Sequence, residues 1–191
     1  MKWSFVLFLL LTFSFLPIYA FELQGTTDPS LNSETDSIFV GLIWQYGNSQ
    51  PAVYGRNCGE INHGKFDFVL DTTPPKLATL QELNLQFSVA YIVLFRDKNG
   101  NRKMDDHDEI VSASLKNCLT FVQGNWVRFL NTLEEIKHFK IPTLRHLNQG
   151  MTLARVQPKR RGFDDLRSIS NRKIHLKWSA NKRPIRYPNW T

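Results

Sequence analysis

The sequence has few cysteines and lacks the short motifs that identify common classes of enzyme. Its five histidines include no H-E-x-x-H spacing, and its two cysteines do not form the paired-cysteine spacing of a zinc site. There is no G-x-S-x-G nucleophile elbow, no phosphate-binding P-loop and no G-x-G-x-x-G dinucleotide fingerprint. The sequence therefore predicts a protein that is not an enzyme.

Apolar runs long enough to cross a membrane are also scarce, because only the N-terminus contains one. Residues 1–20 begin with the positive Lys2, continue through an apolar run and end with Pro17 and the small Ala20. This order is typical of a secretory signal peptide, and it predicts an exported protein: periplasmic, in the outer envelope or secreted. No cysteine follows the run, which argues against a bacterial lipoprotein. An uncleaved membrane anchor stays open, because about nineteen apolar residues can span a bilayer.

Export places Cys58 and Cys118 where disulfides persist. A bridge between them would stabilise the fold by about 4 kcal/mol on the chain-entropy estimate. Two buried free thiols are the alternative, and the sequence does not decide between them.

Acidic residues are few in the last part of the chain. Residues 151–191 hold eleven Lys or Arg against Asp164 and Asp165, a net of +9, so a total of +7 leaves −2 for the rest. This basicity predicts an anionic polymer or surface of the envelope as partner, not nucleic acid, because the protein is exported. The candidate anion-binding residues are Lys159, Arg160, Arg161, Arg172, Lys173, Lys182 and Arg183. A solvated basic face with no ligand is the alternative.

The remaining pattern is that of a β-rich domain. Residues rich in β-branched and aromatic types predict strands over 37–46, 65–71, 86–96, 110–114, 118–122, 151–157 and 173–178. The near-continuous apolar run at 86–96 indicates a strand buried on both faces. Apolar residues at helical spacing predict an amphipathic helix over 126–139, and a short helix is expected over 77–83.

These elements predict a mainly β fold, a β-sandwich or barrel-like domain with one inserted helix. The expected organisation is a signal peptide at 1–20, a flexible leader at 21–36, a β-rich domain at 37–180 and a basic irregular tail at 181–191.

The most specific chemistry lies in residues 97–109, where oxygen-bearing residues stand at the spacing of a calcium-binding loop. The ligands expected at positions 1, 3, 5, 7, 9 and 12 are Asp97, Asn99, Asn101, Lys103 through its backbone carbonyl, Asp105 and Asp108. Glu109 is a substitute at the closing position. Arg102 stands at position 6, where such loops need glycine, and Lys98, Arg102 and Lys103 offset the acidic charge. The expected affinity is therefore weak, roughly 10⁻⁴–10⁻³ M. An acidic hairpin loop whose Asp and Asn side chains bond their own backbone is the alternative.

The loop resembles that of an EF-hand and is still more similar to the D-x-N-x-N calcium loops that join strands in bacterial secreted β-proteins, such as the B-type repeats of Gram-positive surface adhesins. With residues 91–101 included, the chain resembles uncharacterised bacterial envelope β-sandwich proteins. The resemblance implies calcium binding and an extracytoplasmic location, with no reaction. We therefore expect an exported, non-enzymatic protein with a calcium-stabilised loop, structural or binding at the cell envelope. The alternative is a polyanion-binding module acting through the basic C-terminal segment.

Overall fold

The computed structural model describes residues 21–27, 38–44, 53–55, 58–70, 73–82, 85–124, 146–157, 165–170 and 173–176. These residues form a mainly β structure that contains the 3-10 turn η2 (Lys76–Ala78) and no α-helix. The described residues also include no helix with the length and apolar character to cross a membrane. The helix expected over 126–139, the tail at 181–191 and the apolar N-terminal run lie outside the described residues.

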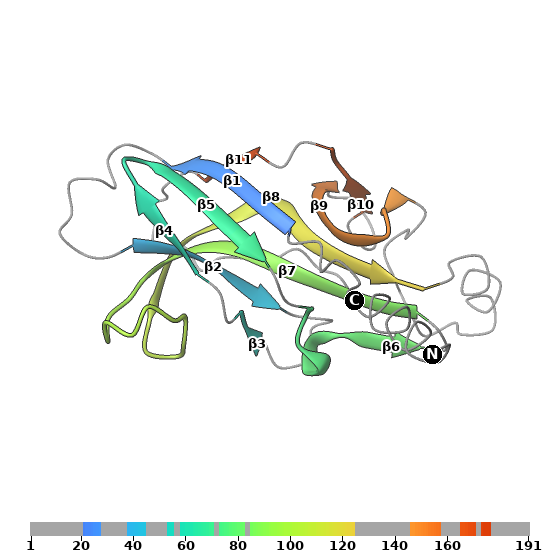
Figure 1. Ribbon diagram of the computed structural model, residues 1–191, viewed down its shortest axis with the longest axis horizontal. Helices are drawn as coiled ribbons and strands as arrows, with labels where there is room; N and C mark the ends of the chain where they lie inside the picture. Colours follow the sequence, from blue (N-terminus) through green and yellow to red (C-terminus); the bar gives the residue numbers. More distant parts are fainter. Residues whose placement is uncertain are drawn as a thin grey trace, which may run out of the picture.

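The strands form one curled, largely antiparallel sheet (Figure 1). Its order is β10 (Asp165–Ser168), β9 (Gly150–Gln157), β8 (Glu109–Gln123), β7 (Leu85–Arg96), β2 (Ile38–Trp44), β4 (Gly59–Asn62), β5 (Lys65–Leu70), β1 (Phe21–Thr27) and β11 (Lys173–Leu176). Two short strands lie off this path: β3 (Val53–Tyr54) pairs with β2, and β6 (Leu80–Glu82) pairs with β7. The strand pair β1–β11 is parallel. The prediction of a mainly β fold is confirmed.

The central strands are buried on both faces, as the apolar run at 86–96 predicts. All seven residues of β2 are buried, and β7 is buried along nearly its whole length between β2 and β8. On one face, alternate residues such as Val40, Ile92 and Leu119 pack against side chains of β1, β5 and β11. On the other face, Phe39, Phe87 and Phe95 belong to a second cluster. The curled sheet thus has two apolar layers, one on each side of β7.

The expected flexible leader is wrong for its first seven residues. Phe21–Thr27 forms β1, which pairs with β5 on one side and with β11 on the other. Phe21 and Leu23 alternate with polar residues and point into the core, which the overall polarity of the segment concealed. A Cβ at Gly25 would lie 2.7 Å from the Ile174 carbonyl oxygen, so the absence of a side chain there lets the strands approach. Residues 28–36 lie outside the described residues.

Two further expectations are corrected. The short helix expected over 77–83 is a single 3-10 turn followed by β6, because Leu80 and Glu82 pair with Phe87 and Leu85 of β7. The strands expected at 110–114 and 118–122 are parts of one strand, β8, with an irregularity in its pairing to β7. Tyr91 pairs with Cys118 and Val93 with Ala113, so the residues between them on β8 bulge out of register.

Candidate functional site

The acidic loop, residues 97–108, joins β7 directly to β8. At its base Arg96 pairs with Glu109 in the ladder, and Arg96 Nη1 lies 3.3 Å from Glu109 Oε2. Lys98 Nζ lies 3.4 Å from the same oxygen. The Glu109 carboxylate therefore belongs to the strand ends, so its expected role as a substitute ligand is not supported by its position, and Asp108 is the last acidic residue of the loop.

Asp97 winds the first half of the loop around its own carboxylate. Its Oδ1 accepts a hydrogen bond from the backbone N–H of Gly100 at 2.8 Å, and its Oδ2 accepts one from the N–H of Arg102 at 2.7 Å. Gly100 has a φ of 72° and Arg102 a φ of 56°, so both residues adopt the left-handed conformation. Arg102 thus makes the sharp turn that glycine usually provides at the sixth position of a calcium loop.

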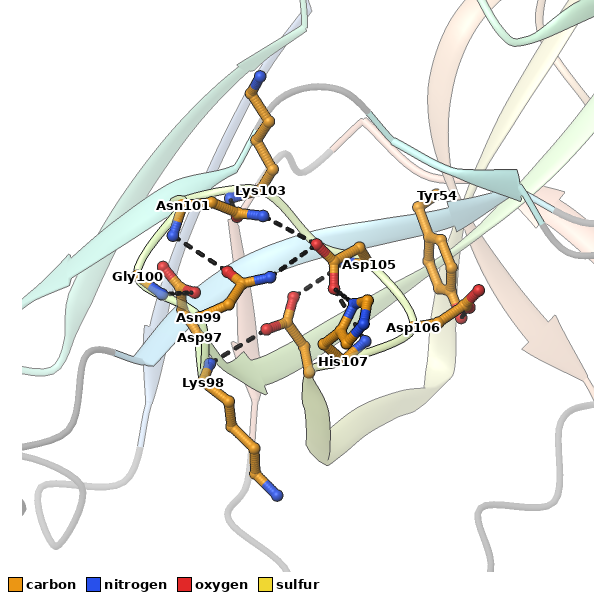
Figure 2. A network of polar contacts seen from close by, with 11 residues as sticks. Tyr54, Asp97, Lys98, Asn99, Gly100, Asn101, Lys103, Asp105, Asp106 and His107 are labelled. Carbon is orange, nitrogen blue, oxygen red and sulfur yellow. Dashed lines mark hydrogen bonds and ion pairs between the residues drawn. The ribbon is translucent and has the colours of Figure 1, made fainter.

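Asn99 and Asn101 face the backbone with their oxygens and Asp105 with their nitrogens (Figure 2). Asn99 Oδ1 accepts from the N–H of Asn101 at 3.1 Å, and Asn101 Oδ1 accepts from the N–H of Lys103 at 2.7 Å. Their Nδ2 atoms donate to the same oxygen, Asp105 Oδ2, at 2.9 and 2.8 Å. The two amide N–H groups therefore lie where a positively charged partner of the Asp105 carboxylate would lie.

Asp105 is the most heavily bonded acid of the loop. Its Oδ1 accepts from the backbone N–H of His107 at 2.8 Å and lies 3.2 Å from His107 Nδ1. These bonds, the His107 N–H first and then the two Asn amides, lower the pKa of Asp105 to about 2. Because these hydrogen bonds hold the pKa of Asp105 below its ordinary value of 3.8, they stabilise the folded protein fully at pH values above 3.8. This stabilisation is lost as the pH falls toward the lowered pKa of about 2.

Asp108 ties the second half of the loop to the first. Its Oδ1 accepts from the N–H of Lys98 at 3.1 Å, and its Oδ2 accepts from the N–H of Asp105 at 2.9 Å. The Asp108 N–H in turn donates to the Asp105 carbonyl oxygen at 3.2 Å. The expected ligands at positions 1, 3, 5, 9 and 12 are thus brought together in one hydrogen-bonded network, and position 7 joins it through its backbone N–H.

Met104 anchors this polar loop in the core. Its side chain is 5% exposed and belongs to the second cluster, with Phe39 and Phe95. A Cβ at Gly41 would lie 3.0 Å from both Met104 Sδ and Phe95 Cε1, so the space for Met104 depends on glycine in β2. Met104 is the one large apolar side chain among residues 97–108. This is the sequence feature from which its anchoring role could have been predicted.

A second anchor comes from the segment that follows β2. The Tyr54 hydroxyl donates to Asp106 Oδ1 at 2.7 Å, and the Cys58 thiol receives a hydrogen bond from the backbone of Met104. Burial raises the pKa of Cys58, the Met104 hydrogen bond opposes this, and the charges of Asp108 and Asp97 raise it further. Neither Tyr54 nor Cys58 carries a sequence signal for this position, because both are far from the loop along the chain.

The two cysteines are free thiols. Cys118 is buried in the middle of β8, opposite Tyr91 of β7 and Ala154 of β9, and burial raises its pKa. Cys118 is thus buried as the alternative of two buried thiols expects, whereas Cys58 is only partly buried.

The expected anion-binding residues fall almost wholly outside the described residues: Lys159, Arg160, Arg161, Arg172, Lys182 and Arg183. Lys173 is placed by its backbone in β11, paired with Gln24. Two other basic residues, Arg155 of β9 and Arg167 of β10, are directly opposite each other in the ladder, and both are exposed.

The acidic loop fits calcium by its chemistry and differs from a coordination shell in its arrangement. Carboxylate and amide oxygens in this order are ligands that calcium takes. Within the described ranges, however, no group of three or more His, Cys, Asp or Glu side chains is placed to hold a metal ion. Instead, backbone N–H groups and the side-chain amides of Asn99 and Asn101 donate hydrogen bonds to the carboxylates. A cation in the loop requires these two amides to present their oxygens.

Comparison of the chain with protein-family models, with curated protein sequences and with solved structures gave no match in any of the three.

Proposed function

We propose that the chain is an exported, non-enzymatic β-sandwich protein in which the acidic loop is a calcium-stabilised brace between β7 and β8. It would act structurally or as a binding protein at a bacterial cell envelope, like the envelope proteins that its 91–101 segment resembles. The apolar pattern at 126–139 would add the one helix. The proposal rests on the loop, the apolar N-terminal run and the absence of catalytic motifs.

The observation that carries the proposal is the conformation of Arg102. The weakest point of the loop as a calcium motif is the lack of glycine at position 6. Arg102 nevertheless adopts a φ of 56° there, with its N–H on Asp97 Oδ2 at 2.7 Å. The backbone therefore already makes the turn that a calcium loop needs at position 6.

In the calcium-bound loop, Asp97, Asn99, Asn101, Asp105 and Asp108 would supply side-chain oxygens and Lys103 its carbonyl oxygen. The cation would replace the amide nitrogens as the positive partner of Asp105. Because Asp97 follows β7 and Asp108 precedes β8, one ion would fix the ends of both strands. Met104 and Tyr54 would transmit this order to β2 and β3. The result is a brace, since strands and not a movable helix pair flank the loop.

Calorimetric titration with calcium chloride, combined with thermal melting, tests this proposal. Binding raises the free energy of unfolding by about 2.7 kcal/mol at a hundred times the dissociation constant. Asp97→Ala should abolish both the heat and the calcium-dependent shift in melting temperature. Asp67→Ala is the matched control, because Asp67 is an exposed acid of β5 and lies outside the loop. No heat and no shift at several millimolar calcium would refute the proposal.

A second candidate, a polyanion-binding module, is favoured by the Arg155–Arg167 pair. Like charges directly opposite on adjacent strands destabilise a sheet. Both arginines are exposed, and neither forms an ion pair with another described residue. The pair lies on β9 and β10, and the sequence between these strands contains Lys159, Arg160 and Arg161. A sulfate or phosphate group between the two guanidinium groups would remove the repulsion.

Binding to heparin at increasing salt tests this candidate. Replacing both arginines, Arg155→Gln with Arg167→Gln, should weaken binding and reduce the slope of log affinity against log salt by roughly two. The melting temperature should stay the same or rise, because a like-charge pair is removed. Lys65→Gln, an exposed change on β5, is the control. Equal affinity of the double variant and the unaltered chain would exclude this pair as the site.

A further inference from the structure

The acidic loop contains an exposed Asn–Gly sequence, Asn99-Gly100. An asparagine followed by glycine is the dipeptide most prone to deamidation, because no side chain hinders the approach of the glycine nitrogen to the asparagine amide. The structure shows how this dipeptide is held. The Gly100 N–H donates to Asp97 Oδ1 at 2.8 Å, and the Asn99 side chain is fixed at both ends, by the N–H of Asn101 at 3.1 Å and by Asp105 Oδ2 at 2.9 Å.

We propose that Asn99 is a deamidation site that the hydrogen bonds of the acidic loop hold in an unreactive geometry. In the reaction, the Gly100 nitrogen attacks Asn99 Cγ, a bond forms between them, and the Cγ–Nδ2 bond breaks. Ammonia leaves, taking up the Gly100 amide proton, and a succinimide remains. Water then opens either carbonyl of the ring, giving aspartate or isoaspartate at position 99.

Three hydrogen bonds oppose the attack. The Gly100 nitrogen must leave Asp97, and the Asn99 amide must leave both Asn101 and Asp105 before Cγ can turn toward the nitrogen. Hydrogen bonds of ordinary strength together slow the reaction roughly a hundredfold relative to the unfolded chain. Asn101 shares the loop but is followed by Arg102, whose side chain obstructs the same attack, so it serves as an internal comparison.

The product changes the loop. Asn99 Nδ2 now donates to Asp105 Oδ2, whereas an aspartate at position 99 places a second carboxylate oxygen there. Like charges in this position repel, so the network opens in the absence of a cation. An aspartate also adds a negative ligand at position 3 of the loop. Deamidation therefore removes one of the hydrogen bonds that close the loop and replaces it with a repulsion.

The experiment is incubation of the full chain in mildly alkaline buffer without calcium, followed by peptide mass spectrometry and an isoaspartate assay. Native protein should deamidate at Asn99 roughly a hundredfold more slowly than the same chain in urea. Asp97→Ala, which frees the Gly100 nitrogen, should raise the native rate by at least about tenfold. Asp67→Ala, the same change at an exposed residue of β5 outside the loop, should leave it unchanged, and Asp97→Ala with Gly100→Ala should suppress the reaction again.

Two outcomes overturn the proposal. One is an equal rate at Asn99 in native and urea-unfolded chains. The other is a folded Asp97→Ala variant, judged by its melting transition, that reacts no faster than the unaltered protein. If Asp97→Ala does not fold, Asp105→Ala gives the same test, because it frees the Asn99 amide. None of these results depends on calcium binding, so they stand apart from the calorimetric test.

Discussion

Arg102 occupies a conformation that costs most side chains free energy. Its φ of 56° brings its N–H to Asp97, while its side chain is exposed. The sequence places Arg102 at the turn position but gives no sign that arginine accepts the glycine conformation there. The reason is local: Asp97 accepts from both Gly100 and Arg102, and two hydrogen bonds to a charged group outweigh the left-handed backbone.

Arg102→Gly should therefore stabilise the protein. Relief of the left-handed conformation favours the folded state by about 1 kcal/mol, after allowance for the greater freedom of glycine in the unfolded chain. Urea unfolding measures the change. Lys103→Gly is the control, because Lys103 is its exposed neighbour without a positive φ, and it should destabilise by roughly 0.5–1 kcal/mol. A loss of stability in Arg102→Gly would show that its side chain matters more than its backbone.

At the scale of elements, the sequence predicts the strands that lead into and out of the loop. The apolar run of β7 and the acidic spacing that follows it are local patterns, and both are found where expected. What cannot be predicted is how the loop is fastened. Tyr54 is separated from Asp106 by 52 residues, and the room for Met104 comes from Gly41 in β2. These contacts arise from strand pairing, which no local pattern encodes.

The errors in the fold have the same origin. The segment Phe21–Thr27 contains few apolar residues, so its composition favours a leader, yet two inward positions suffice once β5 and β11 lie on either side. The strand β8 appears as two runs because its bulge interrupts the alternation on which the prediction depends. Hydrophobic period and composition thus identify strands with a continuous apolar face. They miss a strand such as β1, which has few apolar residues and is held mainly by its pairing with β5 and β11.

For the whole molecule, β1 is what lets the sheet curl over itself. It links β5 to β11, and its inward residues meet those of β2 and β7 in one apolar layer. Leu23 is 0% exposed at the centre of that layer. The N-terminal and C-terminal strands therefore meet in a parallel pair, and the layer is complete only when both ends of the domain are in place.

Leu23→Ala should then destabilise the protein as a core substitution does, by about 2–5 kcal/mol, through lost burial and the cavity left behind. The matched control is Leu77→Ala in η2, since Leu77 is 74% exposed and its truncation should change stability by less than about 0.5 kcal/mol. Urea unfolding measures the free energy of unfolding of both variants, which differ from the unaltered protein by the same Leu→Ala change. A small effect at Leu23, equal to that at Leu77, would mean that β1 is a loosely attached leader after all. A large one places the first strand among the elements that hold the curled sheet closed.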